Sequence, residues 1–204
     1  MRIAYFDCFS GAAGDMILGA LLDAGLALAD LERELGRLHL PGWRLAVEKV
    51  SRGGIGGTLL RVKMDDHIDH AAHHGRMLPE ILRIIDSADL PPEVKANAAR
   101  IFRRLAEAEG QVHRKPPEEI HFHEVGAVDA IIDIVGAAIG LHLLGIDWVA
   151  CSPLRLGSGT VRCAHGTLPV PAPATALLVQ GVPVAGGGEG ALTTPTGAAI
   201  LTSL

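Results

Sequence analysis

The sequence predicts an α/β protein in which a mixed β-sheet is flanked by helices. Of the 204 residues, 49% are hydrophobic and 20% are charged, so the chain can bury a sizeable core. Short β-branched or alternating runs are interspersed with longer runs that have the apolar spacing of helices. Only 3% of the residues are aromatic, against 25 Gly and 12 Pro, so aliphatic side chains must form the core between many turns.

The first half of the chain is expected to begin with a strand, a glycine-rich turn and a helix, followed by a second helix and an antiparallel pair of strands. Pro41 and Gly42 separate the second helix from the pair, and glycines between 53 and 57 separate its two strands. These elements are expected over residues 2–9, 10–15, 16–24, 28–38, 43–50 and 58–64.

The second half begins with a flexible His-rich loop, followed by two amphipathic helices, an extended segment, an apolar helix, a strand and a loop-rich remainder with two short helices. The strands over 2–9 and 148–156 are expected to be central in the sheet, and the pair over 43–64 peripheral. The expected bounds in this half are 65–75, 78–87, 92–109, 120–124, 126–144, 148–156, 174–180 and 198–204.

Charge and cysteine usage narrow the classes of function. The formal net charge is -5 and the pI is near 6.0, which argues against nucleic acid or an anionic membrane as a partner. The most apolar stretch, 125–145, is interrupted by Asp129, Asp133 and His142, so no transmembrane helix is expected. Three cysteines are too few for a disulfide framework, so a cytoplasmic location is expected. Without a repeat or a dividing linker, residues 1–204 are expected to form a single α/β domain.

The turn over 6–15 is the first candidate binding site. A strand that runs into a glycine-rich turn at a helix start presents backbone N–H groups and a partial positive charge, which suit a phosphate or a carboxylate. The carboxylates in and beside it are suitable ligands for a divalent cation bound with a phosphate. An ordinary tight turn is the alternative, because the pattern fits neither common nucleotide-binding motif. The candidate cofactor-binding residues are Asp7, Ser10, Gly11, Gly14 and Asp15.

Histidines are concentrated in the loop over 65–75, which holds four of them together with three aspartates. Neutral imidazoles suit nickel, zinc and copper, and a loop without fixed geometry can capture such a metal. A solvated polar tract is the alternative. The candidate metal ligands are His67, His70, His73 and His74.

The segment over 121–133 is the third candidate. In an extended segment, His121 and His123 point to the same side, while Asp129 and Asp133 share one helix face. The two aspartates lie among apolar residues, and burying an unpaired carboxylate there costs several kcal/mol, so a ligand or cation is the favoured explanation. The alternative is that the aspartates only stabilise the helix N-terminus and that the imidazoles are hydrogen-bonded in the core.

Thr194 and Thr196 belong to a fourth group of loops near the C-terminal end, in which hydroxyl and backbone N–H groups can bind phosphate oxygens. Rigid structural connections are an equally good explanation of these loops.

Four segments together closely resemble the LarC family of nickel insertion proteins. They are YFDCFSGAAGDM (5–16), the Asp/His loop (65–74), HFHEVGAVDAIIDIVGA (121–137), and HGTLPVPAPAT (165–175) with LTTPTGAAIL (192–201). The resemblance implies a nickel chelatase or cyclometallase, a lyase that inserts Ni²⁺ into pyridinium-3,5-bisthiocarboxylic acid mononucleotide. The product is the nickel pincer cofactor of lactate racemase, and the reaction uses CTP with Mg²⁺ or Mn²⁺.

Residue roles follow from combining this resemblance with the residue patterns. Nickel capture is assigned to the four loop histidines, and handover to His121 and His123. Asp129 or Asp133 is expected to act as a ligand or as the base for the pyridinium C–H, and Glu124 is grouped with them as catalytic.

Length is the one departure from the family, whose members are usually about twice as long. The resemblance therefore implies that the chain is an N-terminal portion, and that CTP binding and oligomer formation belong to an absent C-terminal domain. On its own, such a portion is expected to bind nickel and substrate without turnover. The implied partners are the substrate, that C-terminal domain, the lactate racemase apoprotein and further copies of the chain.

Two other functions fit the same residues. A nickel metallochaperone or storage module would use the loop histidines without catalysis. A nucleotide-dependent transferase would use the glycine-rich turn and would not require nickel.

Overall fold

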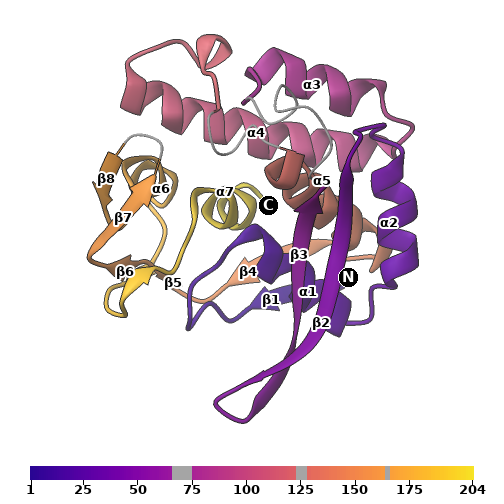
Figure 1. Ribbon diagram of the computed structural model, residues 1–204, viewed down its shortest axis with the longest axis horizontal. Coiled ribbons are helices and arrows are strands. Elements are labelled where there is room, and N and C mark those ends of the chain that lie inside the picture. Colours follow the sequence, from indigo (N-terminus) through magenta and orange to yellow (C-terminus); the bar gives the residue numbers. More distant parts are fainter. Residues whose placement is uncertain (66–74, 123–127, 164–165) are drawn as a thin grey trace.

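The computed structural model describes residues 1–65, 75–122, 128–163 and 166–204. Helices and small two-stranded sheets alternate along the chain, with the long helix α4 across the top of the view in Figure 1. The α/β class predicted from the sequence is confirmed. The helices are α1 Gly14–Asp23, α2 Leu28–Gly36, α3 Leu78–Ser87, α4 Pro92–His113, the 3-10 helix η2 Pro117–Glu119, α5 Val128–Leu143, α6 Pro173–Leu178 and α7 Pro195–Ser203.

Helix α5 lies at the centre of the core. It is apolar around almost its whole circumference, and it packs against α1, α2, α4, α7 and one strand of the hairpin. Two glycines allow the neighbouring helices to approach closely. A Cβ at Gly140 would lie 2.9 Å from Leu21 Cδ1, and one at Gly136 would lie 3.1 Å from Leu18 Cδ2. The close packing of α1 on α5 therefore fixes how the first turns of these two helices lie relative to each other.

The strands predicted over 2–9 and 148–156, which were expected to be central, form a parallel pair in the structure. Strand β1 (Ile3–Phe6) runs parallel to β4 (Trp148–Cys151), in register from Ile3 opposite Trp148 to Phe6 opposite Cys151. The predicted strand over 148–156 is divided at Pro153, which has no N–H for a sheet, and continues as β5 (Leu154–Arg155).

The predicted antiparallel pair is a hairpin of β2 (Trp43–Arg52) and β3 (Ile55–Met64), which projects from the body in Figure 1. It is longer than predicted because Gly53 and Gly54 both have positive φ and close a two-residue turn. The hairpin packs on α1, where a Cβ at Gly19 would lie 2.4 Å from the Thr58 oxygen. The hairpin forms a sheet of its own, separate from the pair of β1 and β4.

Short strands make up most of the C-terminal part of the fold. The strands of the described residues pair two by two, so they form several small sheets where the sequence predicted one mixed sheet. Parallel β5 and β9, antiparallel β6 and β10, and antiparallel β7 and β8 are such pairs. Their bounds are β6 Gly157–Ser158, β7 Thr160–Cys163, β8 Gly166–Pro169, β9 Val184–Ala185 and β10 Gly190–Ala191.

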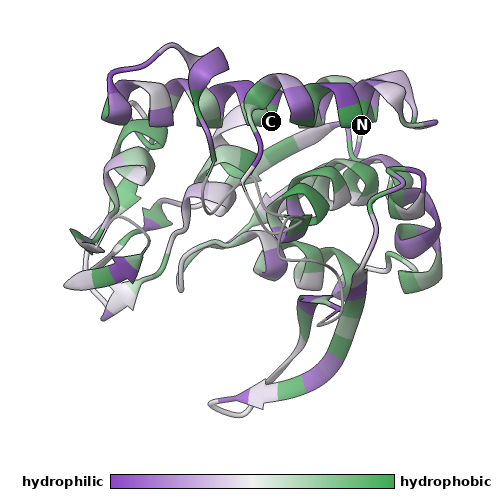
Figure 2. Cartoon of the chain, turned by 45° about the horizontal axis from the view of Figure 1, so that its top comes forward, coloured by the Kyte–Doolittle hydropathy of each residue, from purple (hydrophilic) through white to green (hydrophobic). Residues whose placement is uncertain are grey.

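The amphipathic helices agree closely with their predicted positions. Helix α3 has the predicted bounds, and α4 continues beyond the predicted 109 to His113, where Arg114 adopts a left-handed conformation. Figure 2 shows hydrophilic and hydrophobic residues alternating along the long helix. Each helix in the described ranges is too short or too polar to cross a lipid bilayer.

Candidate functional site

The glycine-rich turn after β1 is joined by hydrogen bonds to the segment before α7. The Gly11 N–H donates to the Cys8 oxygen at 2.9 Å, which closes the turn. On one side the Ala12 N–H donates to the Leu192 oxygen at 3.0 Å, and on the other the Thr194 N–H donates to the Ala12 oxygen at 2.9 Å. The first and fourth groups of candidate residues, about 180 positions apart in the sequence, therefore lie side by side.

Glycines make this close approach possible. Gly11 has a φ of +92°, and a Cβ there would lie 2.0 Å from the Leu192 oxygen. A Cβ at Gly197, in the first turn of α7, would lie 2.2 Å from the Ala12 oxygen. Thr194 caps α7, because its hydroxyl accepts a hydrogen bond from the Gly197 N–H at 3.1 Å. The N-terminal ends of α1 and α7 thus meet at Ala12, and both carry partial positive charge.

Asp133 of α5 is packed against the first residue of α1. A Cβ at Gly14 would lie 2.4 Å from Asp133 Oδ2, so only glycine accommodates the carboxyl group there. Asp133 Oδ1 is buried, and the part of the chain that the structure describes offers it no hydrogen-bond partner. Burial, followed by the charges of Asp15 and Asp129, raises the pKa of Asp133 to about 8.

Asp15 and Asp129 surround this buried carboxyl group from the first turns of α1 and α5. Asp15 accepts a hydrogen bond from the Met16 N–H at 2.8 Å, and Asp129 accepts one from the Ala130 N–H at 2.9 Å. The two helices therefore bring three of the predicted acidic residues into one neighbourhood. A carboxyl group with a pKa near neutral, close to two other acidic residues, can exchange a proton with a ligand at neutral pH.

Asp7 and Ser10 are exposed at the two ends of the loop that leaves β1, and Thr196 is partly buried in the first turn of α7. Cys8, between Asp7 and Ser10 in the sequence, is buried. Burial, the nearby Cys151 and the charge of Asp7 raise the pKa of Cys8 to about 11, so this thiol is neutral at physiological pH.

His121 is exposed and lies beside the residues that follow the His-rich loop. The His121 backbone forms a bridge with Met77, and the Phe122 N–H donates to the Arg76 oxygen at 3.1 Å. Phe122 is buried edge-on against Phe102, with ring centroids 6.4 Å apart. The remaining predicted ligands and one predicted catalytic residue lie outside the described residues: His67, His70, His73, His74, His123 and Glu124.

Within the described ranges, no three or more His, Cys, Asp or Glu side chains are grouped so that they could hold a metal ion. Asp15, Asp129 and Asp133 are therefore neighbours without forming a metal site. The predicted metal ligation by histidine stays a prediction, because only His121 of that set is described.

Two contacts of the site were not anticipated. The Ser152 hydroxyl accepts a hydrogen bond from the Cys8 N–H at 2.7 Å, and Gly197 packs on the turn. Ser152 directly follows a strand that is parallel to β1, a position where ligand-binding residues commonly occur. The strand expected over 148–156 placed Ser152 in its interior, so the position of Ser152 after a strand end emerged only from the structure.

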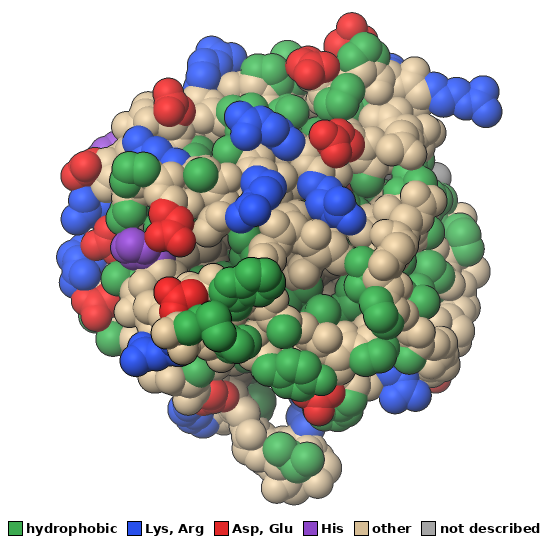
Figure 3. Space-filling model, turned by 180° about the vertical axis from the view of Figure 1, so that it is seen from behind, with side chains coloured by type: hydrophobic (Ala, Val, Ile, Leu, Met, Phe, Trp, Pro, Cys, Tyr) green, Lys and Arg blue, Asp and Glu red, His purple; other side chains and the backbone are tan. Residues whose placement is uncertain are grey.

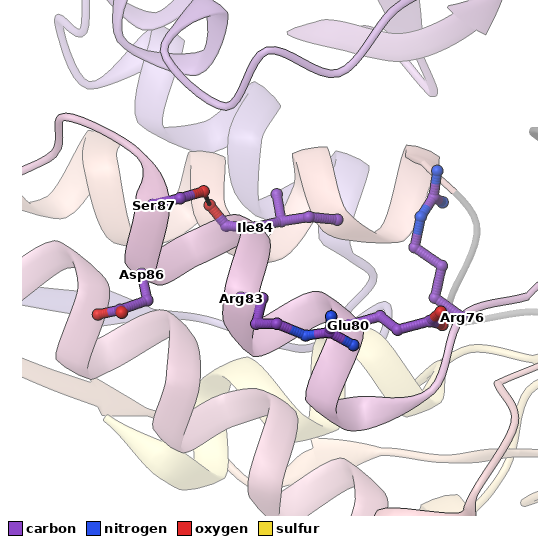
Figure 4. A pocket seen from close by; sticks show the side chains of 6 residues that line it. All are labelled: Arg76, Glu80, Arg83, Ile84, Asp86 and Ser87. Atoms are coloured by element: carbon purple, nitrogen blue, oxygen red, sulfur yellow. Dashed lines mark hydrogen bonds between the residues drawn. The ribbon is translucent and has the colours of Figure 1, made fainter.

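A separate pocket of about 620 Å³ lies along α3, and the described residues that line it include none of the predicted site residues. Figure 4 shows that the Arg76 guanidinium points away from Arg83, while Glu80 turns back toward the start of the helix, where it accepts a hydrogen bond from the Met77 N–H. The charged groups diverge and include both signs. The described lining of this pocket thus mixes basic and acidic side chains.

Comparisons with known proteins identify relatives along the entire chain. The family model described as nickel insertion protein matches residues 4–204. Two relatives from Desulfitobacterium hafniense, strains DCB-2 and Y51, are named pyridinium-3,5-bisthiocarboxylic acid mononucleotide nickel insertion protein, and each is 52% identical over 206 residues. A relative from Syntrophobacter fumaroxidans that carries the nickel insertion protein name is 51% identical over 205 residues.

These alignments cover 100% of the chain but only 50% of the two Desulfitobacterium proteins and 51% of the Syntrophobacter protein. The chain thus spans about half the length of the curated relatives it matches. No solved structure matches it.

Proposed function

The chain belongs to the nickel insertion protein family, and from this premise we propose that it contributes the substrate-binding and proton-accepting groups of a nickel chelatase. The proposed substrates are Ni²⁺ and pyridinium-3,5-bisthiocarboxylic acid mononucleotide, the molecule in the names of the Desulfitobacterium relatives. The proposed product is the nickel pincer cofactor of lactate racemase. We propose that the reaction uses CTP with Mg²⁺ or Mn²⁺, bound by the half of the relatives that this chain does not match.

The observation that carries this proposal is the carboxyl group of Asp133, which is partly buried and whose Oδ1 is buried without a hydrogen-bond partner among the described residues. Nickel insertion at a ring carbon replaces a hydrogen, so the reaction needs a group that removes a proton. The electron pair of the C–H bond then forms the nickel–carbon bond, and the proton is transferred to the base. The pKa of Asp133 is raised to about 8 by burial and by the charges of Asp15 and Asp129, which makes it a suitable base near neutral pH.

The surroundings of Asp133 also favour an anionic substrate. The N-terminal ends of α1 and α7 meet beside it at Ala12, and such ends attract phosphate and carboxylate groups. Asp7, Ser10, Gly11 and Thr196 are proposed to bind the mononucleotide with these ends.

Nickel delivery is assigned to the histidines. We propose that His67, His70, His73 and His74 capture Ni²⁺ and that His121 and His123 receive it. In support, the Arg76 oxygen, just after the His-rich loop, accepts a hydrogen bond from the Phe122 N–H. The chain therefore returns from that loop directly beside His121 and Phe122. Glu124, between this pair and α5, is retained as a proposed catalytic residue.

Mass spectrometry of the substrate tests the proposed role of Asp133. The chain is incubated with Ni²⁺, the mononucleotide, CTP and Mg²⁺, with the remaining half of a family member supplied as a second polypeptide. We expect the substrate to gain nickel and lose protons, at a rate that rises with pH up to about 8 as the Asp133 carboxyl ionises. The variant Asp133→Asn should be slower by roughly 10²- to 10⁴-fold.

Asp86→Asn is the matched control, because Asp86 is exposed on α3, far along the chain from the site. An unchanged rate in Asp133→Asn would refute the role of this carboxyl group as base. A chain that binds nickel but never yields nickel-containing product, even with the second polypeptide, would instead favour the metallochaperone.

A further inference from the structure

The parallel sheet of β1 and β4 has one apolar face that the described residues leave uncovered. The two strands are in register, and along both of them exposed and partly buried residues alternate in the same phase. One set of side chains packs against the core: Ala4, Phe6, Val149 and Cys151. The residues that alternate with these point to the opposite side of the sheet. They form a surface that we call the outer face: Ile3, Tyr5, Trp148 and Ala150.

This exposure is unusual for a parallel sheet. Tyr5 and Trp148 are each 65% exposed, and Ile3 is 54% exposed. Figure 3 shows hydrophobic side chains gathered on one side of the molecule. Parallel sheets occur almost only where other elements cover both faces, because an uncovered face leaves apolar side chains in water. The outer face is therefore a surface on which a further layer of structure fits.

The sheet is held at both ends, so the outer face is already ordered. At one end, the Asp147 carboxylate accepts a hydrogen bond from the Arg2 N–H at 2.6 Å and lies 3.6 Å from the Met1 amino group. At the other end, the Cys8 N–H donates to the Ser152 hydroxyl at 2.7 Å. Binding to an ordered surface costs less conformational entropy than binding to a flexible one.

The outer face also borders the glycine-rich turn. Strand β1 leads directly into that turn, and Tyr5 lines a pocket of about 190 Å³ together with Asp7, Cys8 and Gly11. A layer of structure on the outer face would thus lie beside the first group of candidate binding residues.

We propose that the outer face binds the half of the relatives that this chain does not match. The alignments cover 100% of the chain but 50% of each Desulfitobacterium relative, so those proteins contain a second region of about the same length. The proposal rests on the proposed function for its consequence: that function assigns CTP to the unmatched half, and docking on the outer face would bring this half beside the glycine-rich turn.

The size of the outer face favours this occupant over a second copy of the chain. A stable interface between separate proteins takes roughly 20–30 residues from each partner, whereas the outer face consists of two short strands. A contact between two halves of one polypeptide needs less area, because the covalent link keeps their effective concentration high.

Hydroxyl-radical footprinting with mass spectrometry measures the exposure of individual side chains. The chain alone is compared with a hybrid in which it replaces the matched half of the Desulfitobacterium DCB-2 relative. We expect Ile3, Tyr5 and Trp148 to be modified in the chain alone and to lose most of this modification in the hybrid. Ile55, which is 72% exposed at the tip of the hairpin, is the matched control and should be modified equally in both. Equal modification of Tyr5 and Trp148 in both proteins would overturn the proposal.

Dilution of the chain alone distinguishes the other occupant. If Tyr5 and Trp148 are protected in the concentrated chain and become exposed on dilution, a second copy covers the outer face. That result would overturn the assignment to the unmatched half.

Trp148→Glu provides a second measurement, because burying an unpaired carboxylate opposes docking. In the hybrid, this variant should restore most of the Tyr5 modification seen in the chain alone. Ile55→Glu is the matched control and should leave Tyr5 protected. Urea unfolding of the chain alone checks that Trp148→Glu folds, and Ile3→Glu takes its place if it does not. Full protection of Tyr5 in a folded outer-face variant would contradict the proposal.

The two proposals can fail separately. Protection of the outer face together with no nickel insertion by the hybrid would refute the proposed reaction and leave the docking surface intact. Nickel insertion by a hybrid whose outer face stays exposed would refute the docking surface alone.

Discussion

Asp133 combines a central position in the fold with an unfavourable environment for charge. It packs on Gly14, and its Oδ1 has no hydrogen-bond partner among the described residues. The same carboxyl group that is proposed as a base should therefore make the stability of the protein depend on pH.

The free energy of unfolding should fall as the pH rises from about 4 to about 8. In this range the folded state keeps a proton on Asp133, while the unfolded chain, with a pKa near 3.8, has released it. Each pH unit should lower the free energy by up to about 1.4 kcal/mol, and the effect should level off above pH 8. Asp133→Asn should remove this contribution. Urea unfolding of both proteins between pH 5 and 9 measures the difference, and parallel curves would contradict the raised pKa.

At the scale of elements, helix pairs meet where glycines leave room for them. Helix α5 meets α1 at Gly14, and it meets α1, α2 and the loop between them at Gly136 and Gly140. Gly36, in contrast, ends α2, and a Cβ built on it would have nothing within 4 Å. Similar glycines in the sequence therefore have different structural roles.

Gly14→Ala should destabilise the protein by about 1–3 kcal/mol, because the new methyl group would displace Asp133 from the start of α1. Gly36→Ala is the matched control and should be neutral or stabilising by up to about 1 kcal/mol, since alanine favours helix. Thermal or urea unfolding measures both. Equal stability of the two variants would show that α1 and α5 are not in close contact at Gly14.

For the whole molecule, the proposed nickel path links the His-rich loop to the segment before α5. Calorimetric titration with Ni²⁺ tests it in the unaltered chain, in a variant with His67, His70, His73 and His74 replaced, and in one with His121 and His123 replaced. We expect the second variant to lose one defined site. Loss of all binding in the loop variant alone would instead make the loop the nickel store. Cu²⁺ should bind the loop more tightly than Ni²⁺, so affinity does not identify the metal.

Local patterns in the sequence predicted most of the helices and the strands that pair. The bounds of α3 agree with the prediction, and α1, α2 and α5 lie within a few residues of their predicted bounds. Strands were expected where β1 and β4 occur, but their parallel pairing was not predicted. These features depend on the period of apolar residues and on turn-forming residues, which neighbouring positions encode. The single strand predicted over 148–156 was wrong in one respect, because it is divided at Pro153 into β4 and β5.

Helical spacing placed Asp129 and Asp133 on one face of a helix, but it did not distinguish the exposed carboxyl group from the buried one. That difference depends on Gly14 of α1, which lies more than one hundred positions earlier in the chain. The pairing of Ala12 with the segment 192–194 is likewise a contact between distant residues, and no local pattern encodes it.

The sequence by itself determined the family, the secondary structure and the residue types capable of nickel and proton chemistry. The tertiary structure decided which of them meet. It joined the glycine-rich turn to the segment before α7, brought Asp133 close to two other acidic residues and left Tyr5 exposed beside a small pocket. The physical reason is that burial and electrostatic environment arise from contacts between distant segments, whereas sequence periodicity describes only neighbours along the chain.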